Sequence, residues 1–149
     1  MQNNRDQEII HNIVDNGLSN QAIKGSPIVN MMGTIVDWID MEGSRAQFSY
    51  VITDDLVNGD GVVFGGILSS ALDLSIALAS MAFVPVETKV ATSNLQVQFL
   101  RPCLVGKYRC VVTVVKKGRK LCFCSADLFD SSEKHVASAT ATNLLINDY

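Results

Sequence analysis

Residues 64–80 read FGGILSSALDLSIALAS and form the most apolar stretch of the chain. Two glycines open it, nine of the next fourteen residues are Ile, Leu or Ala, and one carboxylate, Asp73, lies among them. A helix over 66–82 would be apolar nearly all round, which predicts that it is buried on most sides. Burying an unpaired carboxylate is costly, so Asp73 needs a partner or a function.

The length and composition of the chain limit the class of protein that contains this helix. A chain of 149 residues suits one domain, and 48% hydrophobic with 18% charged residues indicates a folded protein. The net charge of −3 argues against general nucleic-acid binding. The apolar run is shorter than the roughly 20 residues of a membrane span and contains an acid. No N-terminal signal peptide is evident, so we expect a cytoplasmic protein that does not bind membranes.

The four cysteines are Cys103, Cys110, Cys122 and Cys124. In a cytoplasm they should remain reduced. Cys122 and Cys124 are two apart in a strand-like run, so both should point to one face. Because neither a second pair nor histidines follow at zinc-site spacing, we expect small buried apolar side chains and no metal site.

The rest of the chain predicts one more helix and about six strands. A short helix over 4–16 has Asn4 and Gln7 at capping-box spacing, whereas 19–32 reads as irregular. Hairpin turns are expected at MEGS (41–44) and KKGR (116–119). The expected strands are 33–40, 45–53, 89–100, 106–115, 120–130 and 135–146.

These elements predict an α+β fold, a curved antiparallel sheet wrapped around one long central helix. Residues 1–29 would be an N-terminal helix and an irregular lead-in, and 30–149 the main domain. Alternation within the strand over 89–100 predicts two faces. One face would carry Thr92, Asn94, Gln96 and Gln98, and the other Ser93, Leu95, Val97 and Phe99.

Three segments resemble a known family: N58-G-D-G-V-V-F-G-G-I-L-S-S-A-L-D73, NLQVQFLRP at 94–102, and KKGRK at 116–120. They are similar to the hotdog-fold acyl-CoA thioesterases of the phenylacetyl-CoA thioesterase-like branch, over roughly residues 30–146. The family pattern is an Asn, a short gap, His-Gly-Gly, and an Asp eight residues after the first glycine. Gly65, Gly66 and Asp73 match it, and Phe64 stands where the family has histidine.

The resemblance implies a hotdog domain over 30–149 that hydrolyses acyl- or aryl-CoA to a free acid and CoA. Coenzyme A would be part of the substrate, and no other cofactor is expected. The resemblance also implies a homodimer, or a dimer of dimers, with Asn58 beside the Gly65 end of the helix and Thr92 beside Asp73. The missing histidine leaves open a non-catalytic acyl-CoA-binding dimer. A hotdog hydratase would need a histidine near its acid, and residues 54–80 contain none.

The chemistry of these residue types fits thioester cleavage. Free N–H groups at the start of a helix, here Gly65 and Gly66, can hold the negative charge that develops on the carbonyl oxygen. The two histidines of the chain lie away from this motif, so Asp73 would act as base or nucleophile. Asp73 is about 12 Å along the helix from Gly65. Two antiparallel helices in a dimer would bring Asp73 of one chain to Gly65 of the other.

Each of these residues also has a purely structural interpretation. Asp73 would be a buried acid held by hydrogen bonds, and Asn58 the first residue of an Asn-Gly turn. Thr92 would be an ordinary strand residue. Phe64, which we assign with Gly66 to substrate binding, would instead pack in the core.

Seven of the twelve basic residues lie between Arg101 and Lys120, with no acid among them. They would form a basic rim for the phosphates of coenzyme A, in which we assign Arg101, Lys117, Gly118, Arg119 and Lys120 to binding. The alternatives are a solvated hairpin that keeps a sheet edge soluble and a short nucleic-acid patch. The run lacks the interleaved aromatic residues typical of such a patch.

Overall fold

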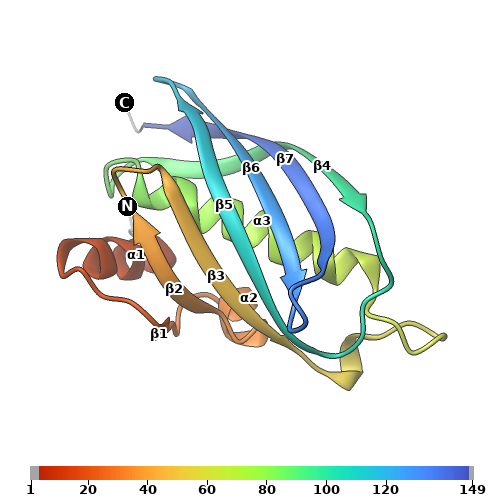
Figure 1. Cartoon of the computed structure of the whole chain (residues 1–149). Coiled ribbons are helices and arrows are strands. Elements are labelled where there is room, and N and C mark those ends of the chain that lie inside the picture. Colours follow the sequence, from red (N-terminus) through yellow and green to blue (C-terminus); the bar gives the residue numbers. More distant parts are fainter. Residues whose placement is uncertain (1–3, 148–149) are drawn as a thin grey trace.

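The computed structural model describes residues 4–147 (Figure 1). Its helices are α1 (Arg5–Asp15), α2 (Pro27–Met31), the 3₁₀ turn η1 (Asp54–Leu56) and α3 (Gly65–Ala82). Its strands are β1 (Gln21–Ala22), β2 (Ile35–Asp40), β3 (Arg45–Ile52), β4 (Lys89–Phe99), β5 (Gly106–Lys117), β6 (Leu121–Asp130) and β7 (His135–Ile146).

The strands form one antiparallel sheet in the order β1-β2-β3-β5-β6-β7-β4. The sheet curves around α3, which lies across its concave face (Figure 1). The expected architecture is confirmed, with β1 as an additional strand. β4 follows α3 in sequence but lies at the far edge of the sheet, where β7 is its one partner strand among residues 4–147.

The segment 19–32, predicted to be irregular, contains two short elements. Gln21 and Ala22 pair with Val36 and Ile35 to form β1. Pro27 begins α2, a position where its fixed φ suits a helix and its missing N–H costs nothing. The prediction was wrong here because elements of two and five residues are too short to show a hydrophobic period.

The N-terminal helix begins as expected, but its capping box is incomplete. Asn4 Oδ1 accepts hydrogen bonds from the backbone N–H groups of Asp6 and Gln7. The Gln7 side chain does not return to Asn4. Its Nε2 donates instead to the carbonyls of Pro85 and Thr88, at 3.0 and 2.9 Å. Gln7 therefore ties α1 to the α3–β4 connection, a contact that spacing within α1 could not reveal.

Helix α3 is the core of the domain. It packs against α1 and the strands β3 to β7. By length and composition it could span a membrane, but 56% of it is buried inside the protein. Ser75, fully buried on α3, pairs with the Tyr50 hydroxyl at 2.6 Å and donates to the Ala71 carbonyl. These bonds satisfy the Ser75 hydroxyl, one of the polar groups that α3 brings into the core.

All four cysteines are buried and free, as predicted. Cys122 and Cys124 do share a face, with their sulfur atoms 3.7 Å apart. Both contact the Ser80 hydroxyl, which also accepts a hydrogen bond from Asn143. Within residues 4–147, no three His, Cys, Asp or Glu side chains are grouped to hold a metal ion.

Ile76 offers a direct test of the importance of α3 to stability, because its side chain is fully buried. We expect Ile76→Ala to lower the free energy of unfolding by about 2–5 kcal/mol, through lost burial and the cavity left behind. Ile28, 41% exposed on α2, is the matched control, and Ile28→Ala should cost under about 0.5 kcal/mol. Urea unfolding measures both. Similar losses in the two variants would contradict a core centred on α3.

Candidate functional site

The N-terminus of α3 presents two free amide donors. Phe64 precedes the helix in an extended conformation and makes no side-chain cap. The first hydrogen bond of the helix runs from Ile67 N–H to the Phe64 carbonyl, at 2.8 Å. Within the described part of the chain, the N–H groups of Gly65 and Gly66 have no hydrogen-bond partner. Together with the helix dipole, they can bind a negatively charged oxygen.

These amides border a hollow of about 370 Å³. Its lining comprises Asn58, Val62, Val63, Gly65, Leu68, Phe99, Leu100, Arg101, Pro102 and Cys103. We call it the amide hollow. The Phe99 ring packs beside Gly65. A methyl group at position 65 would lie 3.4 Å from this ring.

Phe64 does not pack in the core, so its structural interpretation was wrong. Its side chain is 58% exposed, and its ring covers Gly66 so closely that a methyl group there would lie 2.6 Å away. A larger residue at position 66 would therefore displace the Phe64 ring from its position in this structure. Two aromatic rings, of Phe64 and Phe99, flank the donors.

Asn58 is a turn residue, as its structural interpretation expects, and it also lies beside the Gly65 amide. Its Oδ1 accepts hydrogen bonds from the N–H groups of Asp60 and Val62, at 2.9 and 3.2 Å. Its side chain therefore holds the loop before α3. Asn58 also lines the amide hollow with Gly65, and nothing in residues 4–147 accepts a hydrogen bond from its Nδ2. This donor is available to a bound ligand.

Asp73 lies two turns along α3 and is half-buried. The Thr92 hydroxyl donates a hydrogen bond to its Oδ1 at 2.7 Å, so these two predicted residues meet. Half-exposed or exposed residues Gly66, Ser69, Ser70, Asp73 and Ala77 recur at helical spacing. They form one face of α3 that this chain leaves partly open, and we call it the open face.

Thr92 reaches Asp73 because of an irregularity in β4. The register of β4 against β7 shifts between Thr92 and Asn94, which leaves Ser93 as an extra residue. Thr92 pairs with the buried Asn143 and so faces the helix, whereas Asn94 pairs with Thr142. Residues opposite each other share a face of the sheet. The predicted alternation, with Thr92 and Asn94 on one face, was therefore wrong at this point.

The basic residues of 101–120 do not form one rim. β5 is 12 residues long, which separates Lys107 from Lys117 by about 30 Å. Lys117 Nζ donates to the Phe83 carbonyl at 3.0 Å, at the C-terminal end of α3. Arg101 lines the amide hollow at the other end. Arg109 is paired with Glu133 and stacks on Phe129.

Cys103 is the thiol of the amide hollow. Burial raises its pKa above the ordinary value, an effect that a hydrogen bond with Tyr108 partly offsets. Its Sγ donates to the Arg101 carbonyl. A protonated thiol is a poor nucleophile, so burial makes Cys103 less reactive than an exposed thiol.

A family model described as "Thioesterase superfamily" matches residues 60–137, which include the amide donors, Asp73 and Thr92. The chain belongs to the thioesterase superfamily. It is a thioester hydrolase, and its curved sheet around a central helix is the hotdog fold of this superfamily.

Three proteins illustrate what this chain is similar to in sequence or fold. A phenylacetic acid degradation-related protein of Ralstonia eutropha is 31% identical, with a TM-score of 0.77 over 81% of this chain and 92% of its own. The medium/long-chain acyl-CoA thioesterase YigI of Salmonella typhimurium is 23% identical over 56% of this chain and 63% of its own length. The PaaI protein of E. coli, 19% identical, shares the fold with a TM-score of 0.76 over 95% of this chain and 94% of its own.

Thr92 gives a test of how this thioesterase orients Asp73. Thr92→Val removes the hydroxyl at nearly constant volume. We expect kcat to fall about tenfold, the loss of one hydrogen bond to a charged group, with KM little changed. Thr92→Ser keeps the hydroxyl and should retain most activity. Equal activity of the valine and serine variants in steady-state assays would exclude a positioning role for Thr92.

Proposed function

We propose that this thioesterase hydrolyses acyl-CoA, with Asp73 as the general base or nucleophile and the Gly65 amide as the oxyanion donor. One observation carries the proposal: a single helix presents uncommitted amides at its start and a half-buried carboxylate, held by Thr92, on its open face. These are the two groups that cleavage of a thioester requires.

In the general-base route, Asp73 takes a proton from water as the water oxygen attacks the thioester carbonyl carbon. The carbonyl oxygen becomes negatively charged and accepts a hydrogen bond from Gly65 N–H. The tetrahedral intermediate then collapses, the carbon–sulfur bond breaks, and coenzyme A leaves as a thiolate that regains the proton. In the nucleophilic route, the Asp73 carboxylate attacks the carbonyl carbon, the carbon–sulfur bond breaks, and coenzyme A leaves as a thiolate. Water then hydrolyses the mixed anhydride to the free acid and the Asp73 carboxylate, and the proton released from water goes to the thiolate.

We infer that two chains assemble the site. Gly65 and Asp73 lie on one unbroken helix, about 12 Å apart along its axis, too far for one carbonyl group to reach both. The open face of α3 consists mainly of small residues, which suits close contact with a second helix. β4 is an edge strand whose outer side has no partner strand in residues 4–147. An antiparallel pair through β4 and α3 would bring Asp73 to the partner's Gly65.

The same arrangement gives the basic hairpin a role. Lys117, Gly118, Arg119 and Lys120 lie at the C-terminal end of α3, far from Gly65 of their own chain. In an antiparallel dimer this hairpin would approach the partner's Gly65. We propose that Arg119 and Lys120 contact the phosphates of coenzyme A there. A dimer of dimers is compatible with this pairing.

The acyl group is proposed to be apolar, because Leu68, Phe99 and Phe64 surround the amides. The printed names of the relatives refer to phenylacetic acid degradation and to medium and long acyl chains. A panel of phenylacetyl-, benzoyl- and C6 to C16 acyl-CoA thioesters, read by thiol release, would identify the preferred class. Tight binding across the panel without thiol release would instead indicate an acyl-CoA-binding protein.

Mixing two inactive variants tests the shared site. Asp73→Asn and Gly65→Pro chains, unfolded together and refolded in equal amounts, form mixed dimers for half of the product. Each mixed dimer has one site with both intact groups, so we expect about a quarter of wild-type activity. No recovery after mixed dimers are demonstrated by mass spectrometry would contradict a site shared between chains.

A further inference from the structure

A second hollow lies at the start of β5, with a volume of about 570 Å³. It lies between the β4–β5 connection and the turn that joins β6 to β7. Its lining includes Arg101, Pro102, Lys107, Asp130, Ser132 and Lys134. We call it the basic hollow. Its size is in the range of pockets that hold small molecules.

Three cations line the basic hollow without an acidic partner. Arg101, Lys107 and Lys134 are exposed, and no ion pair within residues 4–147 involves them. Arg109, on the same strand as Lys107, shows the contrast, because Glu133 already neutralises it. Unpaired cations that converge on one concave surface attract anions.

One acid, Asp130, shares the lining, but its carboxylate is already engaged. Its Oδ1 accepts hydrogen bonds from the N–H groups of Ser132 and Lys134, at 2.9 and 3.0 Å. These bonds fix the β6–β7 turn that carries Lys134. The hollow thus holds three cations against one acid, with serine hydroxyls as further donors. This donor set suits phosphate groups.

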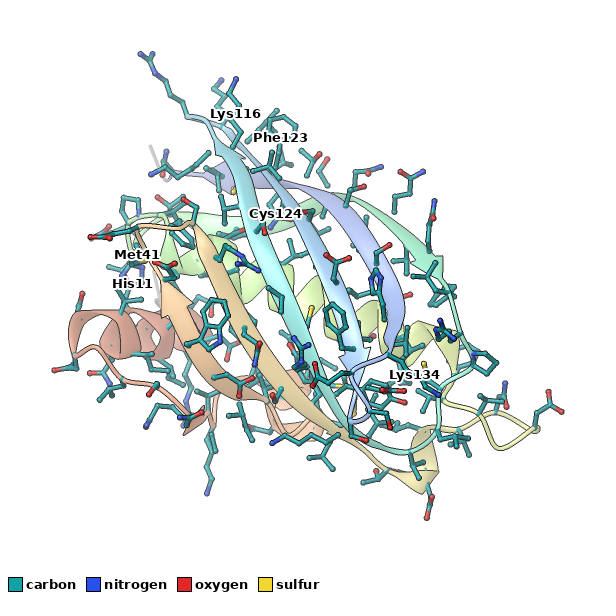
Figure 2. All side chains as sticks on the ribbon, viewed as in Figure 1. His11, Met41, Lys116, Phe123, Cys124 and Lys134 are labelled. Atoms are coloured by element: carbon teal, nitrogen blue, oxygen red, sulfur yellow. The ribbon has the colours of Figure 1, made fainter. Side chains whose placement is uncertain are left out.

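The basic hollow adjoins the amide hollow of the same chain. Arg101 and Pro102 line both. Figure 2 shows Lys134 at the end of the molecule where α3 begins, opposite Lys116 at the tip of the β5–β6 hairpin. A ligand whose reactive end lies at Gly65 could therefore extend past Arg101 into this hollow without crossing to a second subunit.

We propose that the basic hollow binds the phosphate groups of the 3′-phosphorylated nucleotide of acyl-CoA, in the same chain that supplies the Gly65 amide. The identity of the ligand rests on the proposed function. The cations provide the contacts, Arg101 at the junction of the two hollows and Lys107 and Lys134 farther in. This hollow is a nucleotide site distinct from the partner hairpin of Arg119 and Lys120.

The kinetic test compares two substrates with the same acyl group, acyl-CoA and the acyl-N-acetylcysteamine thioester, which has no phosphate. We expect Lys107→Ala/Lys134→Ala to raise KM for acyl-CoA about tenfold, the loss of roughly 1.4 kcal/mol of binding, with kcat little changed. Its kcat/KM for the truncated thioester should equal that of the wild type. An unchanged KM for acyl-CoA, or equal losses on both substrates, would overturn the proposal.

Two further double variants serve as comparisons. Lys24→Ala/Arg45→Ala removes the same charge from exposed positions outside both hollows, so KM should stay at the wild-type value. Arg119→Ala/Lys120→Ala removes the hairpin cations. If KM rises only in this hairpin variant, the nucleotide does not use the basic hollow and the proposal fails, while thioesterase activity stands.

Calorimetry with adenosine 3′,5′-bisphosphate measures binding to the basic hollow independently of thioester hydrolysis. We expect it to bind the wild type and to lose at least tenfold in affinity with Lys107→Ala/Lys134→Ala. That result in a protein that releases no thiol from acyl-CoA would support the pocket and refute the proposed function. Inorganic phosphate binding as tightly as the bisphosphate would refute the nucleotide assignment.

Discussion

Asp73→Asn is expected to lower kcat for acyl-CoA hydrolysis by about a hundredfold or more. Asparagine keeps the shape of the side chain and an oxygen that can accept the Thr92 hydrogen bond. It cannot take a proton from water or attack a carbonyl carbon. Because Asp73 is only half-buried and lies on the open face of α3, the fold should be retained.

The measurement is steady-state thiol release, with urea unfolding and the oligomer mass measured in parallel. Asp15→Asn, an exposed acid at the end of α1, is the matched control and should leave kcat unchanged. Hydrolysis by Asp73→Asn at the wild-type rate on every acyl-CoA tested would remove Asp73 from the mechanism. The superfamily assignment would stand, and another group would have to activate the water.

Gly65→Pro is expected to lower kcat by roughly a hundred- to a thousandfold, because proline lacks the N–H that would hold the oxyanion. The backbone tolerates the change. Position 65 is the first residue of α3, where proline is favoured, and Phe64 already has the extended conformation that precedes proline. The variant thus replaces the amide hydrogen by the Cδ of the proline ring, with little change to the helix backbone.

Gly65→Ala is the matched control, because it adds the same Cβ beside Phe99 but keeps the amide donor. Its kcat should remain within severalfold of the wild type, and circular dichroism should be the same for both variants. Equal losses in the alanine and proline variants would mean that crowding against Phe99, rather than the missing donor, accounts for the effect.

The sequence predicted the elements that have a strong pattern of their own. α3 is marked by its apolar length, and the hairpins by turn residues between alternating strands, so their bounds differ from the structure by only a few residues. The sheet around a single helix followed from the need to cover α3. β1 and α2 were not predicted, because neither has a hydrophobic pattern of its own. β1 is defined by its pairing with β2, and α2 is a single short turn that begins at Pro27.

The family resemblance predicted that Thr92 lies beside Asp73, but the alternation expected for the strand gave the wrong reason for it. Asp73 and Thr92 meet only because β4 is irregular at Ser93, and no local signal marks which residue of a strand a partner strand will leave unpaired. The prediction that the basic residues of 101–120 form one rim was wrong for a related reason. Residues close in sequence lie far apart when a long strand passes between them, so Lys107 shares a hollow with Lys134 instead of Lys117.

That one helix carries both the amides and the carboxylate has a genetic consequence. In the proposed dimer, a chain altered at both Gly65 and Asp73 would spoil both sites of any dimer it enters. Each site of such a mixed pair would lack one group. A cell expressing equal amounts of intact and doubly altered chains would keep about a quarter of its activity rather than half. The doubly altered allele would therefore be dominant, whereas each single alteration would complement the other.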